Sequence, residues 1–227
     1  MNEQLSIVIC VYNEEFNIKP LVSQIKNALG NRDYEIVYVD DGSSDNTAAV
    51  IKSLEDPKVR LIELRKNYGQ SAALSAGIDH AKGDFIITMD GDLQNDPQDI
   101  PSMLQKLKKE NFDIVAGIRK NRQDGMFMRK IPSRIANYII RLTTGVKMKD
   151  YGCTLKVFKR VAAKDLNLYG ELHRFIPVLA SLEGSKIGQM NVRHHIRKHG
   201  YSKYGINRTF KVISDLLFML FMKKYMS

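Results

Sequence analysis

Apolar and polar positions in the first half of the chain follow two alternating patterns. Short runs rich in Val, Ile and other apolar residues predict buried strands over residues 5–12, 34–40, 59–64, 84–89 and 113–117. The stretches between them carry apolar residues at helical spacing. This βαβα alternation predicts an α/β fold with a mostly parallel central sheet flanked by helices, whose ligands bind beyond the carboxyl ends of the strands.

The predicted helices have recognisable ends. Asn17 can cap a first helix that ends at Gly30, because Asn is favoured before a helix and Gly after it. Ser44 or Asp45 can cap a second helix that extends to Leu54. Further helices are predicted over residues 71–81 and from residue 97 onward.

The second half of the chain is less periodic. It contains a basic loop at 119–130, helices near 132–144 and 173–183, a strand near 187–193, a loop at 197–205 and a final helix at 209–226. We find no repeat, low-complexity tract or linker. The sequence therefore predicts one α/β domain over residues 1–208, followed by a C-terminal amphipathic helix at 209–227.

The composition is that of an ordinary globular protein, with 44% apolar and 26% charged residues. The N-terminal segment lacks the basic region and cleavage site of a secretory signal. The two cysteines, Cys10 and Cys153, show no CxxC spacing, which argues against a disulfide framework or a zinc site. A reducing, cytoplasmic setting is the expectation.

The net charge of +10 is unevenly distributed. Residues 1–110 contain 12 Lys and Arg against 18 Asp and Glu, whereas residues 111–227 contain 23 against 7. A basic half of this kind suits nucleic acid, an anionic membrane surface or a phosphorylated substrate. Charge alone does not separate these three partners.

An acidic turn follows the fourth predicted strand. Asp90 and Asp92 are two residues apart and Gln94 comes next, so their oxygen atoms can reach one divalent cation. Hard oxygen ligands suit Mg²⁺ or Mn²⁺, which bridge the phosphates of a nucleotide. A solvated acidic loop is the alternative interpretation, which the position at a strand's carboxyl end disfavours.

Polar residues also close the first two predicted strands. Asp40 and Asp41 could accept hydrogen bonds from a base or a ribose, and Tyr12 could stack on a base. Capping turns explain both groups equally well. Neither GxGxxG nor GxxxxGK[ST] follows any strand, so dinucleotide oxidoreductases and P-loop NTPases lose their main support.

Six motifs in order resemble family 2 glycosyltransferases of the GT-A fold. They are VYNEE, VDDGSSDNT, LRKNYGQSAALSAG, MDGDLQNDP, HRFIP and RKHGYSKYG. The chain is most similar to the polyprenyl-phosphate sugar transferases, typified by dolichol-phosphate mannose synthase and bacterial undecaprenyl-phosphate glycosyltransferases. Many members have proline where this chain has Cys10, which should pack there as a small apolar residue.

The resemblance implies roles for particular residues. The nucleotide-sugar donor would contact Val11, Tyr12, Glu14, Asp40, Asp41, Asp90 and Arg119. The metal would be held by Asp90, Asp92 and Gln94, and the acceptor phosphate by Arg129, Arg197, Ser202 and Lys203. The residues expected to act in the reaction itself are Asp92, Asp150, Arg129 and Lys203.

The implied reaction transfers a hexosyl group from a UDP- or GDP-linked sugar to a polyprenyl phosphate, with inversion, at the cytoplasmic face of a membrane. The cofactor would be Mg²⁺ or Mn²⁺. A phosphate acceptor is already mostly ionised at neutral pH, so it needs cations more than a general base. Asp150 is the best candidate for a base or an orienting group, and a turn-capping aspartate is the equal alternative.

Two further segments have open interpretations. His173, at the start of an otherwise apolar helix, could contact acceptor or sugar, or could simply lie at a surface helix start. The final helix has a wide apolar surface flanked by lysines and is too short to span a bilayer. It could dock on an anionic membrane surface or pack as an ordinary core helix.

Two other functions compete with this interpretation. A family 2 glycosyltransferase could instead use a sugar or glycan acceptor in polysaccharide assembly, although the basic half and the RKHGYSKYG segment favour a phosphate-bearing acceptor. A nucleic-acid-binding domain would leave the acidic turns unexplained, and no RNA-recognition or helix-turn-helix signature occurs. We therefore expect no nucleic-acid partner.

Overall fold

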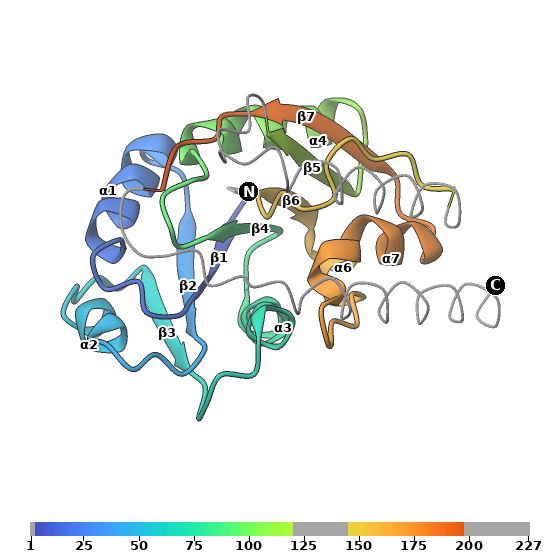
Figure 1. Cartoon of the computed structure of the whole chain (residues 1–227). Coiled ribbons are helices and arrows are strands. Elements are labelled where there is room, and N and C mark those ends of the chain that lie inside the picture. The colour runs from blue at the N-terminus through green and yellow to red at the C-terminus, as the bar shows by residue number, and fades with distance from the viewer. Residues whose placement is uncertain (1–2, 120–144, 198–227) are drawn as a thin grey trace.

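The computed structural model describes residues 3–119 and 145–197. Within them, seven strands form one sheet in the order β3-β2-β1-β4-β6-β5-β7 (Figure 1). The strands are β1 (Leu5–Val11), β2 (Tyr34–Asp40), β3 (Val59–Glu63), β4 (Phe85–Asp90), β5 (Ile114–Arg119), β6 (Lys156–Lys159) and β7 (Ile187–Val192). All neighbouring strands pair in parallel except β6, which is antiparallel to both β4 and β5.

Helices cover both faces of the sheet (Figure 1). They are α1 (Ile18–Leu29), α2 (Thr47–Lys52), α3 (Gln70–His80), α4 (Ile100–Lys109), α6 (Arg160–Lys164) and α7 (Ile176–Leu182), with short 3-10 helices η1 (Pro97–Asp99) and η2 (Leu172–Phe175). Residues of α1 and α4 share one apolar core, and residues of α3, α6 and α7 share the other. Alternate side chains of β1 pack into the two cores, Ile7 and Ile9 into the first and Val8 into the second.

The α/β sheet predicted from the sequence is confirmed, with corrections at several boundaries. The second helix spans Thr47–Lys52, so its N-cap position is Asn46 rather than Ser44 or Asp45, and it ends before Leu54. The side chain of Asp45 instead accepts bonds from the backbone N–H and the hydroxyl of Thr47, in the turn that precedes the helix. The expected helix at 173–183 is divided into η2 and α7. Two elements were not predicted: β6 and the short helix α6 that follows it.

The start of α1 also differs in detail from the expected cap. Asn17 is the residue before the helix, but its side chain makes no cap hydrogen bond. Its amide instead donates to Oε2 of Glu14 at 2.5 Å. Asn17 therefore fixes the turn after β1, which belongs to the candidate site, while Gly30 ends the helix as expected.

The predicted helix at 132–144, the loop beyond residue 197 and the final helix lie outside the described residues, so the division at residue 208 stays a prediction. No helix among residues 3–119 and 145–197 is long and apolar enough to cross a membrane.

Candidate active site

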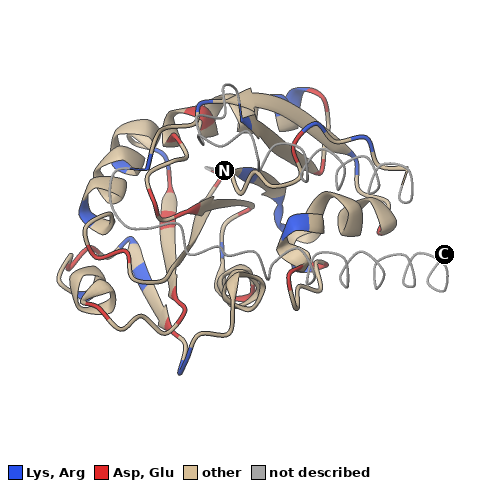
Figure 2. Ribbon diagram, viewed as in Figure 1, with Lys and Arg blue, Asp and Glu red and all other residues tan. Residues whose placement is uncertain are grey.

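The carboxyl ends of three parallel strands bring the sequence-predicted acidic residues together. Val11 at the end of β1 lies opposite Asp40 at the end of β2, and Cys10 lies opposite Asp90 at the end of β4. Figure 2 shows the turn after β4 as an acidic stretch directly beyond the tip of that strand. The edge of the sheet predicted to bind ligand therefore carries the carboxylates.

Glycine is required in the acidic turn. A Cβ atom at Gly91 would lie 2.5 Å from Cγ1 of Val11, so only glycine lets the turn pack against the end of β1. Leu93 then takes a positive φ of 63°, and Oδ1 of Asp92 accepts a bond from the backbone N–H of Gln94 at 3.1 Å. These features fix the direction in which both carboxylates point.

Two side chains from other elements hold Asp90. Oδ1 accepts a hydrogen bond from Nε2 of Gln70 at 2.9 Å, and Oδ2 accepts one from Oγ1 of Thr154 at 2.7 Å. Gln70 is the first residue of α3, and Thr154 lies two residues before β6. Asp90 is therefore oriented by one donor from α3 and one from the segment before β6.

Asp92 is buried, with only 5% of its surface exposed. Burial, and then the charge of Asp90, raise the pKa of the Asp92 carboxyl to about 7, although Arg197 opposes the shift. Nη2 of Arg197 donates to Oδ2 of Asp92 at 2.5 Å, and Nη1 lies 3.3 Å from Oε1 of Glu14. A positive charge thus lies between two carboxylates from the ends of β4 and β1.

The segment that carries Arg197 is paired directly with the acidic turn. The backbone N–H of His195 donates to the carbonyl oxygen of Gln94 at 2.8 Å, and Nε2 of Gln94 donates back to the His195 carbonyl at 3.3 Å. Asn95 and His194 form an isolated antiparallel bridge. Gln94 therefore connects the turn to the segment before the predicted phosphate loop.

The turns after β1 and β2 are bonded to each other. The backbone N–H of Asn13 donates to Oγ of Ser43 at 2.9 Å, and Ser43 in turn donates to Oδ1 of Asp40. Asp41 accepts the backbone N–H groups of Tyr68 at 2.7 Å and of Gly69 at 2.9 Å. Asp40 and Asp41 thus organise the loops that surround the predicted nucleotide pocket, whatever contacts they make to a donor.

Arg119 and Asp150 form a two-point ion pair on the other side of β4. Nε and Nη2 of Arg119 lie 2.7 and 2.9 Å from the two carboxylate oxygens of Asp150. Burial alone lowers the pKa of Arg119, but the bond and charge of Asp150 outweigh it, so that the net pKa shift is upward. Asp150 also accepts the N–H of Gly152 at 3.1 Å, so the geometry favours an orienting and turn-capping role over that of a base.

His173 is buried rather than at a surface helix start, with 7% of its surface exposed. Its backbone N–H donates to Oγ of Ser71 at 3.1 Å, and that hydroxyl lies 2.9 Å from Nδ1 of the imidazole. With the imidazole neutral, the contact to Ser71 is satisfied when the hydroxyl donates to Nδ1 and the ring proton is on Nε2. Burial, and then Arg174 and Lys156, lower the pKa of His173 to about 3, so the imidazole is neutral.

The acidic turn fits a hard divalent cation by its donor atoms. Asp90, Asp92 and Gln94 offer oxygen ligands, and the guanidinium of Arg197 already shows that Asp92 accepts a cation. No cluster of three or more His, Cys, Asp or Glu that could hold a metal occurs in the described part of the chain. A metal held by the side chains of this turn would leave coordination positions open to phosphate oxygens.

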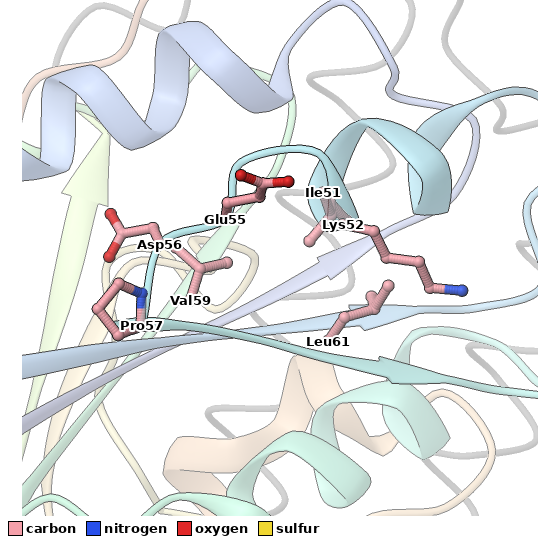
Figure 3. Close-up of a pocket in the computed structure, with 7 residues that line it drawn as sticks. All are labelled: Ile51, Lys52, Glu55, Asp56, Pro57, Val59 and Leu61. Carbon is pink, nitrogen blue, oxygen red and sulfur yellow. The ribbon is translucent and has the colours of Figure 1, made fainter.

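A hollow of about 390 Å³ lies elsewhere, between α2, the following turn and β3 (Figure 3). Ile51, Val59 and Leu61 form its apolar part, and Lys52, Glu55 and Asp56 are at its rim. None of the predicted site residues lines it. We assign it no part in the chemistry.

The structure brings most of the sequence-predicted site residues that it describes to one edge of the sheet. Arg129, Ser202 and Lys203 lie outside the described residues, and their roles stay predictions. Gln70 and Thr154 were not predicted, although Gln70 stands in the LRKNYGQSAALSAG motif that carried part of the resemblance. The contacts of Gln70 and Thr154 with Asp90 depend on the packing of α3 and β6 beside β4, which no local sequence pattern predicts.

The fold and the acidic turn define the class of protein: a GT-A-fold domain with a mixed sheet and an Asp-Gly-Asp turn at the end of β4. The chain belongs to glycosyl transferase family 2, whose family model matches residues 6–166. Solved structures agree with the fold. A glucosyl-3-phosphoglycerate synthase from Mycobacterium tuberculosis, in complex with Mn²⁺ and uridine-diphosphate-glucose, superposes with a TM-score of 0.71 at 17% identity, covering 97% of this chain and 79% of that one.

Curated relatives are more similar in sequence. A dodecaprenyl-phosphate galacturonate synthase from Rhizobium johnstonii is 49% identical over 229 residues, covering 98% of this chain and 68% of that protein. An undecaprenyl-phosphate 4-deoxy-4-formamido-L-arabinose transferase from Shewanella sediminis is 40% identical over 218 residues, covering 94% of this chain and 65% of that protein. The chain thus spans about two thirds of the length of the curated relatives it matches.

Proposed function

We propose that this protein transfers a hexosyl group from a nucleotide sugar to a polyprenyl phosphate. The relatives named for dodecaprenyl- and undecaprenyl-phosphate transferases support the acceptor. The observation that carries the proposal is the contact between Arg197 and Asp92. It joins the segment expected to bind acceptor phosphate to the turn expected to bind the donor diphosphate, so both substrates would meet at one edge of the sheet.

The donor half of the site is formed by the ends of β1, β2 and β4. Asp90 and Asp92 would hold Mg²⁺ or Mn²⁺ on the donor diphosphate, as the oxygen donor set and the Mn²⁺ complex of the structural neighbour suggest. When bound, such an ion acts as a Lewis acid toward the departing diphosphate. Gln70 and Thr154 keep Asp90 in the required orientation, and Val11, Tyr12, Glu14, Asp40 and Asp41 would surround the nucleoside.

The acceptor half relies on cations. Arg119, fixed by Asp150, ends β5 at the same edge of the sheet as the acidic turn, and there it would contact a phosphate of the donor or the acceptor. Arg197, together with Arg129, Ser202 and Lys203 of the undescribed segments, would hold the acceptor phosphate. An already ionised phosphate oxygen attacks without a general base, which agrees with the engagement of both Asp150 oxygens by Arg119. We propose inversion at the anomeric carbon, as a single displacement requires.

The test is a panel of UDP- and GDP-linked sugars incubated with the full chain, Mn²⁺ and a short polyprenyl phosphate. Products are separated by thin-layer chromatography and identified by mass spectrometry. We expect a lipid-linked sugar from the phosphate and none from the matching polyprenol, which differs only by the phosphate. The stereochemistry of the product, read by NMR, tests inversion. Transfer to a soluble glycan but not to polyprenyl phosphate would replace this proposal with the polysaccharide-assembly alternative.

A further inference from the structure

Arg197 occupies the position at which the acidic turn needs a positive charge. Its guanidinium spans Oδ2 of Asp92 at 2.5 Å and Oε1 of Glu14 at 3.3 Å. The side chains of Glu14 and Asp92 are only 9% and 7% exposed, and that of Arg197 is 22% exposed. Two carboxylates withdrawn from water are unfavourable without a counter-ion, and Arg197 is the cation within ion-pair distance of both among the described residues.

The same contact opposes the binding of a metal by Asp92. Oδ1 of Asp92 already accepts the backbone N–H of Gln94, and Oδ2 accepts Arg197. A divalent cation would need one of these oxygens, and it would also repel a guanidinium at contact distance. The carboxylate can therefore serve Arg197 or a metal ion, and the two cations compete for it.

Arg197 cannot move far when it is displaced. Two residues before it, His195 is paired with Gln94 through both backbone and side-chain bonds, so the segment stays attached to the acidic turn. A guanidinium released from Asp92 would remain within the length of its own side chain from the donor phosphates. That location suits an arginine expected to bind the acceptor phosphate.

Arg193, four residues earlier, has a different environment. It pairs with Asp99 through Nε at 3.1 Å and with Asp96 through Nη1 at 3.2 Å, and its side chain is 58% exposed. Neither partner belongs to the Asp90–Asp92 turn. The chain thus contains a matched arginine in the same segment that forms carboxylate pairs without blocking the proposed metal ligands.

We propose that Arg197 is an exchangeable counter-ion of the acidic turn, which pairs with Asp92 and Glu14 in the free enzyme and is released to the acceptor phosphate when a divalent cation binds Asp92. This inference rests on the metal and acceptor roles of the proposed function. It makes binding ordered, because the acceptor phosphate gains its arginine only after the metal, and with it the donor, has bound. Arg197 is in this respect a positioning residue for the acceptor that also sets metal affinity.

The test measures Mn²⁺ binding to the full chain in the presence of saturating UDP or GDP, by electron paramagnetic resonance of free Mn²⁺ and by calorimetry. Arg197→Gln removes the competing charge, and we expect it to tighten Mn²⁺ binding about tenfold, the scale of one charge-assisted hydrogen bond. Arg197→Lys keeps the charge but cannot span both carboxylates, so its Kd should lie between the two. Arg193→Gln is the control and should leave the Mn²⁺ Kd unchanged. Thermal melts establish that each variant is folded.

A second measurement tests the order of binding. A short polyprenyl phosphate is titrated into the wild-type protein with and without saturating Mn²⁺, and we expect tighter binding with Mn²⁺. In Arg197→Gln this dependence on Mn²⁺ should disappear, because no arginine is released.

The outcomes separate this inference from the proposed function. If Mn²⁺ binds the wild type and Arg197→Gln with equal affinity, or binds the variant more weakly, the proposed exchange of Arg197 for the metal is wrong. The proposed metal site at Asp92 is then unaffected. If Mn²⁺ binds neither protein, with or without a nucleoside diphosphate, the metal role itself is wrong and the inference fails with it.

Discussion

Arg119 and Asp150 meet through two parallel hydrogen bonds, of 2.7 and 2.9 Å, although 31 residues separate them in the sequence. Arg119 ends β5, and Asp150 lies in the turn that leads to β6. A planar guanidinium held at two points by a carboxylate has one fixed orientation. The remaining N–H donors of Arg119 are then directed by Asp150.

We expect Asp150→Asn to lower kcat/KM about ten- to hundredfold, since an orienting bond near the reacting groups affects positioning rather than proton transfer. The pH profile of kcat should keep its shape, and Asp150→Glu should recover part of the activity. The control is Asp113→Asn, which removes the ion pair with Lys159 at the opposite end of β5. A profile that loses its acidic limb in Asp150→Asn would instead identify Asp150 as a general base.

The sequence predicted β1 and β2 well because both strands are buried on both faces and read as continuous apolar runs. It did not predict β6. That strand is only four residues long, KVFK, and has lysines at both ends. Lys156 is nevertheless buried, with its ammonium bonded to the carbonyl oxygen of Cys153, and burial lowers its pKa. A lysine in the middle of a sheet contradicts the pattern on which sequence-based strand prediction depends.

The candidate site also has features that the sequence predicts and features that it does not. The carboxyl-end rule predicts from the sequence alone that Asp40, Asp90 and Asp92 lie at one edge of the sheet. The contact of Asp92 with Arg197 spans 105 residues, and it depends on how the segment after β7 returns across the acidic turn. No local pattern encodes such a return. Side-chain partners from distant segments therefore had to come from the structure.

Metal dependence is the prediction for Asp92. Chelator should abolish transfer, and added Mn²⁺ or Mg²⁺ should restore it. Asp92→Ala should reduce activity about a hundredfold or more, because the charge developing on the leaving diphosphate loses its stabilisation. Asp84→Asn, at the opposite end of β4, serves as the control, since Asp84 bonds Gln4 and Arg160 far from the turn. Full activity in excess chelator would rule out the metal role.

Gly91 provides a test of how the acidic turn is positioned. The methyl group of Gly91→Ala would overlap Cγ1 of Val11, so we expect a loss of about 1–3 kcal/mol in the free energy of unfolding and weaker Mn²⁺ binding. Removing the obstacle with Val11→Ala in the same chain should recover part of both losses. Additive effects in this double-mutant cycle would show that the two residues do not constrain each other.

Membrane association is predicted from the segment after residue 208, which lies outside the described residues. A polyprenyl tail leaves the bilayer only at about 0.8 kcal/mol for each CH₂ exposed to water, so the enzyme must reach the headgroup layer. Basic residues contribute about 1 kcal/mol each to attraction by anionic lipid. We expect binding to anionic liposomes that is reversed by salt, and weaker binding for Leu217→Ser combined with Phe221→Ser.

Neutral phosphatidylcholine vesicles are the control for this membrane prediction. Absence of binding to anionic liposomes at low salt would contradict it. If the double variant unfolds, the helix is part of the core, which is the alternative that the sequence left open.

The buried imidazole of His173 makes a prediction about stability at low pH. Its folded-state pKa is about 3, and the ordinary value is 6.5, so between these values the unfolded chain binds one more proton than the folded protein. Stability should therefore fall as the pH drops from 6.5 toward 3. Between pH 7.5 and pH 5 this one group accounts for a loss of about 2 kcal/mol in the free energy of unfolding.

The variant that isolates this contribution is His173→Asn. The asparagine carbonyl can accept the hydroxyl proton of Ser71 as Nδ1 does, but it does not titrate, so the bond is kept and the proton linkage removed. Urea unfolding at pH 7.5 and pH 5 should show that the wild type loses about 2 kcal/mol more than the variant on acidification. The control, His80→Asn on the exposed end of α3, should leave that difference at the wild-type value. Equal acid losses in wild type and His173→Asn would mean that His173 is accessible to protons in the folded protein, and the Ser71 contact would then not hold the imidazole neutral.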